Sequence, residues 1–394
     1  MTRISRRNFV ATSTFLAATA AFGRGALGQI VAPTKPLNLN VVDTAGDLAL
    51  TQKIFENYAR AKPSYVGRFS FSKALQPDMP GKIRAQQDAK QVDIDLVLCG
   101  YDGLTAGIEQ KIWLELLPAH QKVLPNPDEI YLPGALKIQQ QTMGQGMVMA
   151  YSPYGSLLEY MPDRVKTVPR TADEFLAWCR QNKNRFIYAR PANSGPGRAF
   201  ITGLPFLLGD SDPTDPVNGW TKTWSYLKAV GENVEYYPAA TGAALKEFAE
   251  GSRDMMPTTT GWDINPRALG VVPKEAKIAA LEGFHWVSDA HCVAIPRGVA
   301  EEKIPVLLDL ISFMLTPPQQ ANIYDSGYFY PGPSIKNAPL SMAPEESRNL
   351  IAEYGRPEYE GLIASHPQEP PLTPSATAAA FRIWDQQIGA ARHN

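Results

Sequence analysis

The sequence contains little cysteine, almost no net charge and no C-x-x-C pair. Only three cysteines occur among 394 residues, so a zinc site built on paired cysteines is not predicted. Their odd number and wide spacing do not demand a disulfide, and the apolar runs around Cys99 and Cys292 favour buried free thiols. The formal net charge of −1 provides no electrostatic footprint for nucleic acid. We therefore expect no nucleic-acid partner.

Catalytic signatures are also missing from the sequence. The chain has no G-x-S-x-G elbow, no P-loop, no G-x-G-x-x-G turn and no H-E-x-x-H helix. His285 and His291 lie on an expected strand, which would hold them ~20 Å apart, too far to share a metal ion. We therefore predict a protein that is not an enzyme and has no catalytic residue, no cofactor and no metal site. An exported hydrolase is the alternative from another class.

Residues 1–28 have the pattern of an export signal. A basic start precedes a weakly apolar run of small residues, and Ala-Leu-Gly at 26–28 fits a cleavage site before Gln29. The apolar run is too short for a stable membrane-spanning helix, which needs ~20 residues. SRRNF at 5–9 resembles a twin-arginine signal, and an ordinary secretory signal is the other interpretation. Either signal predicts that the mature chain lies in the periplasm.

The rest of the chain alternates strand and helix patterns. At a prior of ~150 residues per domain, its length predicts two or three domains. Nearly continuous apolar strands such as 92–100 alternate with helices, which indicates βαβ units and mainly parallel sheets. A further strand is expected at 185–191. Thr171 and Glu174 form a capping box that predicts the start of a helix.

Two α/β lobes are predicted from this pattern. Extended runs near 146–153 and 270–290 indicate that the chain crosses between the lobes at least twice. We assign residues 29–148 and 278–394 to the first lobe and residues 149–277 to the second.

Loops that follow the expected strands hold the candidate ligand-binding residues. Ligands of open α/β sheets bind beyond the carboxyl ends of the strands, and here those loops are rich in Gly, Ser, Thr, Asp and aromatic residues. The candidates are Asp43, Tyr101, Asp102, Tyr154, Asn193, Ser194, Arg198, Trp262, Asp263, Trp286, Asp289 and Tyr328.

Several of these residues also have a purely structural interpretation. Trp286 can pack in the core, and the nearby His291 can be a strand histidine with its hydrogen bonds satisfied. Of the two aspartates at the first helix start, Asp47 fits a cap, and Asp43 is the better ligand candidate.

The turn at 193–198 bears on the charge of the ligand. It can be an ordinary turn with a helix cap, or its N–H groups and Arg198 can hold a carboxylate or phosphate. An aromatic and acidic cleft favours an organic cation. Arg198 leaves a zwitterion or a phosphorylated solute open.

Motifs spread over most of the mature chain occur in a characteristic order. They are VVDTAGDLALTQKIFENYA (41–59), DIDLVLCGYDGL (93–104), GMVMAYSPYGSLLEY (146–160), ARPANSGPGRAF (189–200), MMPTTTGWD (255–263), AHCVAIPRGV (290–299) and LISFMLTPPQQANIYDSGYFYPG (310–332). In this order they resemble the periplasmic extracellular solute-binding proteins (family 1) of ABC importers. The resemblance is greatest to the branch that includes polyamine, thiamine and ferric-iron binders.

The resemblance implies both a fold and a function. The fold is the two-lobed type II periplasmic-binding-protein fold, with a mainly parallel sheet in each lobe and a ligand cleft between them. The function is capture of a small-molecule solute by a monomer that closes about a hinge and delivers the solute to ABC permease subunits. Where relatives present an acidic residue to a cationic ligand, this chain has Asp289 and His291, so polyamine binding does not carry over directly. A sensor subunit that presents its ligand to a receptor is the remaining alternative.

Overall fold

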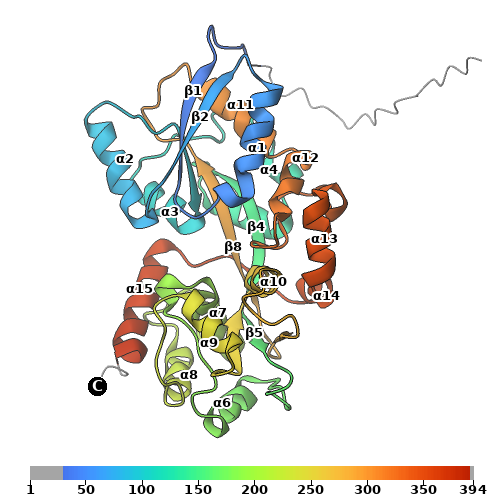
Figure 1. Ribbon diagram of the computed structural model, residues 1–394. Coiled ribbons are helices and arrows are strands. Elements are labelled where there is room, and N and C mark those ends of the chain that lie inside the picture. Colours follow the sequence, from blue (N-terminus) through green and yellow to red (C-terminus); the bar gives the residue numbers. More distant parts are fainter. Residues whose placement is uncertain (1–29, 391–394) are drawn as a thin grey trace, which may run out of the picture.

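The computed structural model describes residues 30–390, and the predicted export signal lies outside the described residues. The chain forms two lobes, one above the other in Figure 1. Strands β4 (Met147–Gly155) and β8 (Trp286–Ala294) run side by side from the first lobe toward the second. The predicted two-lobed α/β fold is confirmed.

The first lobe is built on a mixed sheet. Its order is β2-β1-β3-β8-β4-β9, with β10 paired to β8. The other strands are β1 (Leu37–Asp43), β2 (Val66–Lys73), β3 (Leu96–Gly100), β9 (Gly332–Pro333) and β10 (Gln368–Glu369). β1, β2 and β3 are parallel as predicted, whereas β8 is antiparallel to β3 and to β4. The prediction of a mainly parallel sheet is therefore corrected: β4 carries the chain out to the second lobe and β8 brings it back, so they run in opposite directions.

The second lobe has a small antiparallel sheet. β5 (Leu157–Tyr160) lies between β6 (Met255–Thr258) and β7 (Lys277–Ala279). The strand predicted at 185–191 forms only an isolated parallel bridge, between Phe186 and Met255. The Arg190 N–H donates to the Pro238 carbonyl in another segment, so this stretch forms no continuous ladder with β6.

Helices cover the sheets of both lobes. Those of the first lobe are α1 (Leu48–Ala61), α2 (Met79–Asp88), α3 (Tyr101–Glu109), α4 (Pro127–Ile130), α5 (Pro133–Gln141), α11 (Ile304–Met314) and α12 (Pro317–Gln320). The second lobe has α6 (Ala172–Gln181), α7 (Gly195–Leu208), α8 (Thr221–Gly231) and α9 (Thr241–Ala249). Beside the crossing strands lie α10 (Thr260–Ala268), α13 (Glu345–Tyr354) and α14 (Glu358–Ser365). None of the described helices is long and apolar enough to cross a membrane.

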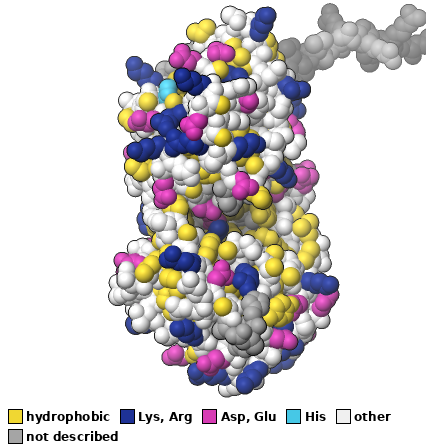
Figure 2. Space-filling view, turned by 90° about the vertical axis from the view of Figure 1, so that its left-hand side faces the viewer, with side chains coloured by type: hydrophobic (Ala, Val, Ile, Leu, Met, Phe, Trp, Pro, Cys, Tyr) yellow, Lys and Arg dark blue, Asp and Glu magenta, His cyan; other side chains and the backbone are white. Residues whose placement is uncertain are grey.

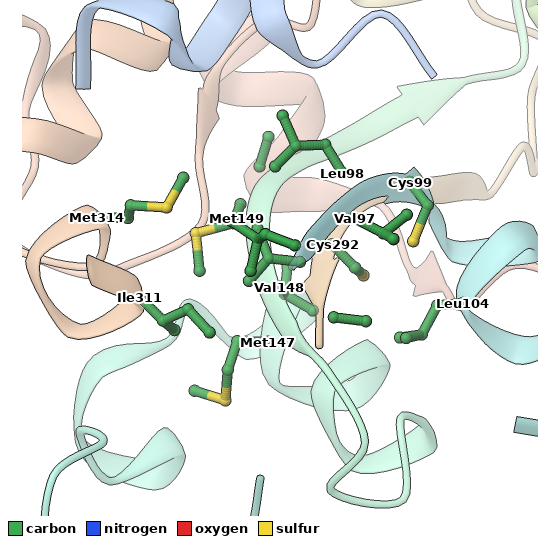
Figure 3. Close-up of a cluster of buried hydrophobic side chains, with 14 of the residues drawn as sticks. Val97, Leu98, Cys99, Leu104, Met147, Val148, Met149, Cys292, Ile311 and Met314 are labelled. Atoms are coloured by element: carbon green, nitrogen blue, oxygen red, sulfur yellow. The ribbon is translucent and has the colours of Figure 1, made fainter. Parts of the chain in front are cut away.

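Local sequence signals explain where several helices begin. The predicted Thr171 cap is confirmed, because its hydroxyl accepts from the Glu174 N–H, and the Glu174 carboxylate reaches back to the N–H of Arg170, one residue before the cap. The strands β3 and β4 are buried along their whole length, and so is β8 except at Asp289. Figure 3 shows part of this first-lobe core, with Val97, Val148 and Ile311 packed between sheet and helix.

The chain crosses between the lobes a third time near its end. After β10, residues 370–373 lead to α15 (Pro374–Trp384), which lies beside α7 and α8 in Figure 1. Trp384 is fully buried there, and its indole N–H donates to the Tyr188 hydroxyl (3.0 Å). These residues pack on the second lobe, whereas the sequence assignment placed residues 278–394 with the first.

Candidate solute-binding site

A cavity of about 200 Å³ lies between the two lobes. Its lining comes from both lobes, and Figure 2 shows the surface hollowed at this level, with acidic and basic side chains in the hollow. The lining residues are Thr44, Ala45, Gln76, Gly100, Asp102, Tyr154, Gly195, Arg198, Trp262, Asp289, His291, Tyr328 and Phe329. This set is called the interlobe cleft below. A smaller recess shares Asp102, Tyr154, Arg198 and Asp289 with it and continues toward Tyr101 and Thr377.

An ion pair joins the two sides of the interlobe cleft. Arg198 lies in the first turn of α7, in the second lobe, and Asp289 lies on the crossing strand β8. The guanidinium Nη2 donates to the Asp289 carboxylate over 2.7 Å. Both side chains are partly buried, so the pair is screened less than one on the open surface. Each charge neutralises the other, and neither is free for a charged solute unless the pair opens.

Aromatic rings form one wall of the cleft. Trp262, in the first turn of α10, lies edge-on to Tyr328 with ring centroids 5.9 Å apart. The ring centroids of Tyr154, on β4, and Phe329 lie 5.9 Å apart. Burial raises the pKa of the Tyr154 and Tyr328 phenols, so both remain neutral hydrogen-bond donors at physiological pH. Such rings can stack on a planar solute or face a cation.

Tyr154 is held in a strained backbone conformation. Its φ of 69° lies in the left-handed region, which residues with a Cβ seldom adopt. The strand register with β8 shifts between Ser152 and Gly155, so the bulge turns Tyr154 toward the second lobe. Strain of this kind persists where the surroundings fix it, often at binding sites.

The first lobe contributes an unpaired carboxylate. Asp102 lies in the first turn of α3, immediately after β3, as predicted from the sequence. Among the described residues its carboxylate has no hydrogen-bond donor and no ion-pair partner. Gln76 completes this wall, because its Oε1 accepts from the Gly100 N–H (2.9 Å) and its side chain is thereby fixed at the end of β3. The opposite charges of Arg198 and Asp289 cancel, so Asp102 gives the cleft its net negative charge.

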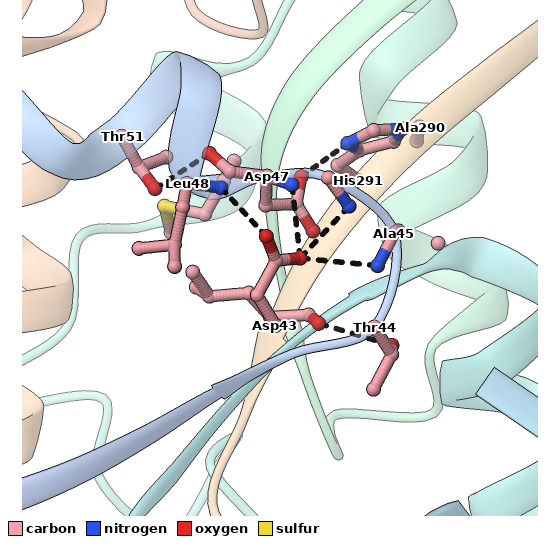
Figure 4. Close-up of polar contacts among 12 residues, drawn as sticks. Asp43, Thr44, Ala45, Asp47, Leu48, Thr51, Ala290 and His291 are labelled. Carbon is pink, nitrogen blue, oxygen red and sulfur yellow. Dashed lines mark hydrogen bonds and ion pairs between the residues drawn. The ribbon is translucent and has the colours of Figure 1, made fainter. Parts of the chain in front are cut away.

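His291 and Asp47 form a second polar pair at the cleft. Figure 4 shows His291 on β8 reaching Asp47 at the start of α1, with the imidazole Nδ1 bonded to Asp47 Oδ1. Burial raises the pKa of Asp47, partly opposed by His291. Burial acts to lower the pKa of His291, but the charge and hydrogen bond of Asp47, together with the charges of Asp289 and Asp102, raise that pKa overall. Both shifts favour a proton held within the pair.

Some predicted site residues have structural roles and do not line the cleft. The Asp43 carboxylate accepts from the backbone N–H groups of residues 45–48, which fixes the start of α1 (Figure 4). Asp43 thus has the role at the helix start that was predicted for Asp47, whereas the Asp47 carboxylate bonds to His291 and does not line the cleft. Ser194 caps α7 by accepting from the Gly197 N–H, and Asn193 is exposed in the turn before it. The turn is therefore a helix cap, as one interpretation predicted, and its Arg198 faces the cleft.

Asp263 and Trp286 also lie outside the cleft. Asp263 is fully buried and accepts from Arg267 (2.9 Å), Arg356 (2.5 Å) and the Tyr359 hydroxyl (2.7 Å). Trp286 is fully buried too, and its indole N–H donates to the Leu362 carbonyl. The neighbours Trp262 and Asp263 thus point in different directions, as successive residues on a helix do.

The remaining predicted residues lie close together in the structure. Asp102, Tyr154, Arg198, Trp262, Asp289 and Tyr328 line the interlobe cleft, and Tyr101 lines the adjoining recess. No group of acidic, histidine and cysteine side chains suited to a metal ion occurs within residues 30–390. The arrangement is suited to holding a solute.

Comparison with known proteins agrees with this geometry. Residues 54–350 match the family of bacterial extracellular solute-binding proteins. The chain belongs to this family. A search of the curated proteins finds no match.

Solved structures share the fold of this solute-binding protein. An ABC transporter structure from Clostridium perfringens is similar at a TM-score of 0.67 and 14% identity, covering 89% of this chain and 99% of that one. The binding protein AfuA from Actinobacillus pleuropneumoniae, with fructose-6-phosphate bound, has a TM-score of 0.58 and 14% identity, with 89% and 98% covered. A periplasmic thiamin binding protein has a TM-score of 0.57 and 16% identity, with 93% and 99% covered. At such identities these likenesses show the fold alone.

Several residues of the interlobe cleft were not predicted from the sequence. Gln76 lies in a short 3₁₀ turn after β2. Apart from its place in a polar loop, nothing in the surrounding sequence marks it as a residue of the cleft. Phe329 follows Tyr328 in a loop, where its ring packs against His291 at 4.4 Å between centroids. His291 could have been found from its position two residues after Asp289, because alternate residues of a strand share a face.

Proposed function

We propose that this solute-binding protein captures a small organic cation and delivers it to an ABC importer permease. One observation carries the proposal: the unpaired Asp102 carboxylate shares a cleft with the rings of Trp262, Tyr328 and Tyr154. A carboxylate supplies the counter-charge, and a cation over an aromatic ring adds about 0.5–2 kcal/mol depending on desolvation. Arg198 is already paired with Asp289, which disfavours an anionic solute as the principal ligand.

The proposed mechanism is closure of the lobes about the crossing strands. Asp102 belongs to the first lobe, and Arg198 and Trp262 lie across the cleft from it. A solute that contacts both sides binds the closed form more tightly and shifts the population toward it. The closed form is the one that docks on the permease. In this proposal the mature chain starts near Gln29, is periplasmic and acts as a monomer.

A thermal-shift screen of the mature protein tests the proposal. Primary amines, polyamines and thiamine-like cations should raise the melting temperature, because a ligand at 100 times its Kd stabilises by about 2.7 kcal/mol. Sugar phosphates and carboxylates of similar size form the comparison set. If only the anions shift the melting temperature, the proposed ligand class is wrong. If no solute does so and a chromogenic ester is turned over, the hydrolase is the better account.

A further inference from the structure

Cys99 and Cys292 face each other across two neighbouring strands. They are register partners on the antiparallel strands β3 and β8. Both side chains are buried, at 2% and 1% exposed, and their sulfur atoms are unbonded in this structure. Figure 3 labels both within the first-lobe core. Each stands next to a cleft residue, since Gly100 follows Cys99 and His291 precedes Cys292.

The register allows a covalent bond between these two cysteines. Directly opposed residues of an antiparallel pair have Cα atoms ~4.5–5.5 Å apart and point to the same face of the sheet. Disulfides span Cα separations of ~4.4–6.8 Å. Cys179 provides a contrast, because it lies in the second-lobe core without another cysteine as a neighbour. We propose that Cys99 and Cys292 form a cross-strand disulfide when this exported protein folds under oxidising conditions.

The bond would form by thiol–disulfide exchange with a small disulfide oxidant. One cysteine thiolate attacks the oxidant and releases one thiol, and the second cysteine then attacks the mixed disulfide and releases the other thiol. The protein loses two hydrogens, and the oxidant disulfide is reduced to two thiols. Burial raises the pKa of both cysteines, and nearby acidic groups raise each further; the pKa of Cys99 is also raised by Cys292. The exchange therefore takes place before the sheet closes, while the thiols are still accessible.

The position of the pair gives the bond a structural consequence. β3 precedes the first crossing and β8 follows the return crossing, so β5, β6 and β7 of the second lobe lie between the two cysteines in the sequence. The disulfide would hold β8 against β3 even if the second lobe opened locally. It would also fix the backbone that presents Gly100 and His291 to the interlobe cleft.

Thiol counting on the refolded protein tests this inference. The mature chain is unfolded in reductant, refolded with oxidised and reduced glutathione, unfolded again without reductant and alkylated, and its mass is measured. Only Cys179 should be alkylated, and the intact mass should fall by two hydrogens before alkylation. Alkylation of all three cysteines, or a bond that includes Cys179, would overturn the inference. The outcome does not depend on which solute binds, so it is separable from the proposed function.

Matched variants keep the test decisive. Cys179→Ala should still form the bond, and its oxidised form should melt several degrees above its reduced form. Cys99→Ala and Cys292→Ala should melt at the same temperature with and without reductant. If either of these variants fails to fold, the thiol count of Cys179→Ala alone decides the question. An oxidised Cys179→Ala protein with two reactive thiols would contradict the proposed bond.

Discussion

Two aspartates show how the surroundings of a residue decide its role. Asp102 lies at a helix start beside the cleft without a partner, whereas Asp263 is enclosed by two arginines and a tyrosine. Both follow strand ends in the sequence, and both were predicted as ligand residues. Sequence position alone cannot separate them, because the partners of Asp263 include Arg356 and Tyr359, which are far away in the chain.

Replacing each aspartate by asparagine should separate binding from stability. Asp263→Asn removes the buried carboxylate that pairs with both Arg267 and Arg356, and we expect a loss of about 3–5 kcal/mol in the free energy of unfolding. Asp102→Asn removes one acidic residue from a helix start and should cost about 0.3–1 kcal/mol. Its affinity for a cationic solute should fall by roughly tenfold or more. Urea unfolding and calorimetric titration measure the two effects. Equal affinity of Asp102→Asn and wild type would remove Asp102 from the site.

The Asp47–His291 pair predicts a pH dependence of stability. Both pKa values are raised in the folded protein, so the native state binds more protons than the unfolded state from pH 3.8 to above 6.5. The stabilisation from His291 is therefore complete below pH 6.5 and is lost as pH rises through its folded pKa.

Unfolding measurements across this range test the pair. The free energy of unfolding of wild type should decline relative to that of His291→Gln as the pH rises above 6.5. The variant has no imidazole to titrate at this position, so its own pH profile should be flatter. Parallel profiles for the two proteins would show that the pair does not hold the proton.

At the scale of elements, the N-terminus of α7 fits closely against β4. A Cβ on Gly195 would lie 1.9 Å from the Tyr154 hydroxyl and 3.2 Å from the Trp262 indole nitrogen. Gly195→Ala should therefore displace the aromatic wall, cost about 1–3 kcal/mol and weaken solute binding. Gly242, near the start of α9, is the matched control, because its added Cβ meets nothing within 4 Å. Gly242→Ala should be neutral or slightly stabilising. Normal affinity in Gly195→Ala would contradict this account of the wall.

The predicted elements succeeded where local signals were strong. The strand predicted at 92–100 forms only from Leu96 to Gly100, whereas the Thr171 cap and the parallel pairing of β1 with β3 follow from apolar runs and capping residues near one another in the chain. The segment at 185–191 looks equally apolar, yet its partners are Met255 and Pro238, and no pattern within the segment reveals that. Long-range hydrogen bonding of this kind overrides local preference.

At the scale of the whole molecule, the order of motifs predicted two lobes and a cleft between them. The alternation of strands and helices does not reveal which lobe the C-terminal residues pack against. In the structure Trp384 packs on the second lobe, against Tyr188 and Tyr237. The third crossing thus places a further connection beside the hinge. The recess behind Arg198 and Asp289 lies next to it, lined in part by Pro371 and Leu372.

A crystal structure of the mature protein with a cationic solute from the screen tests the central claim most directly. We predict that the ammonium lies within hydrogen-bond distance of Asp102, that the solute contacts Trp262 and Tyr328, and that the two lobes approach each other around it. A solute bound away from the interlobe cleft, or bound there with its charge remote from Asp102, would contradict this account.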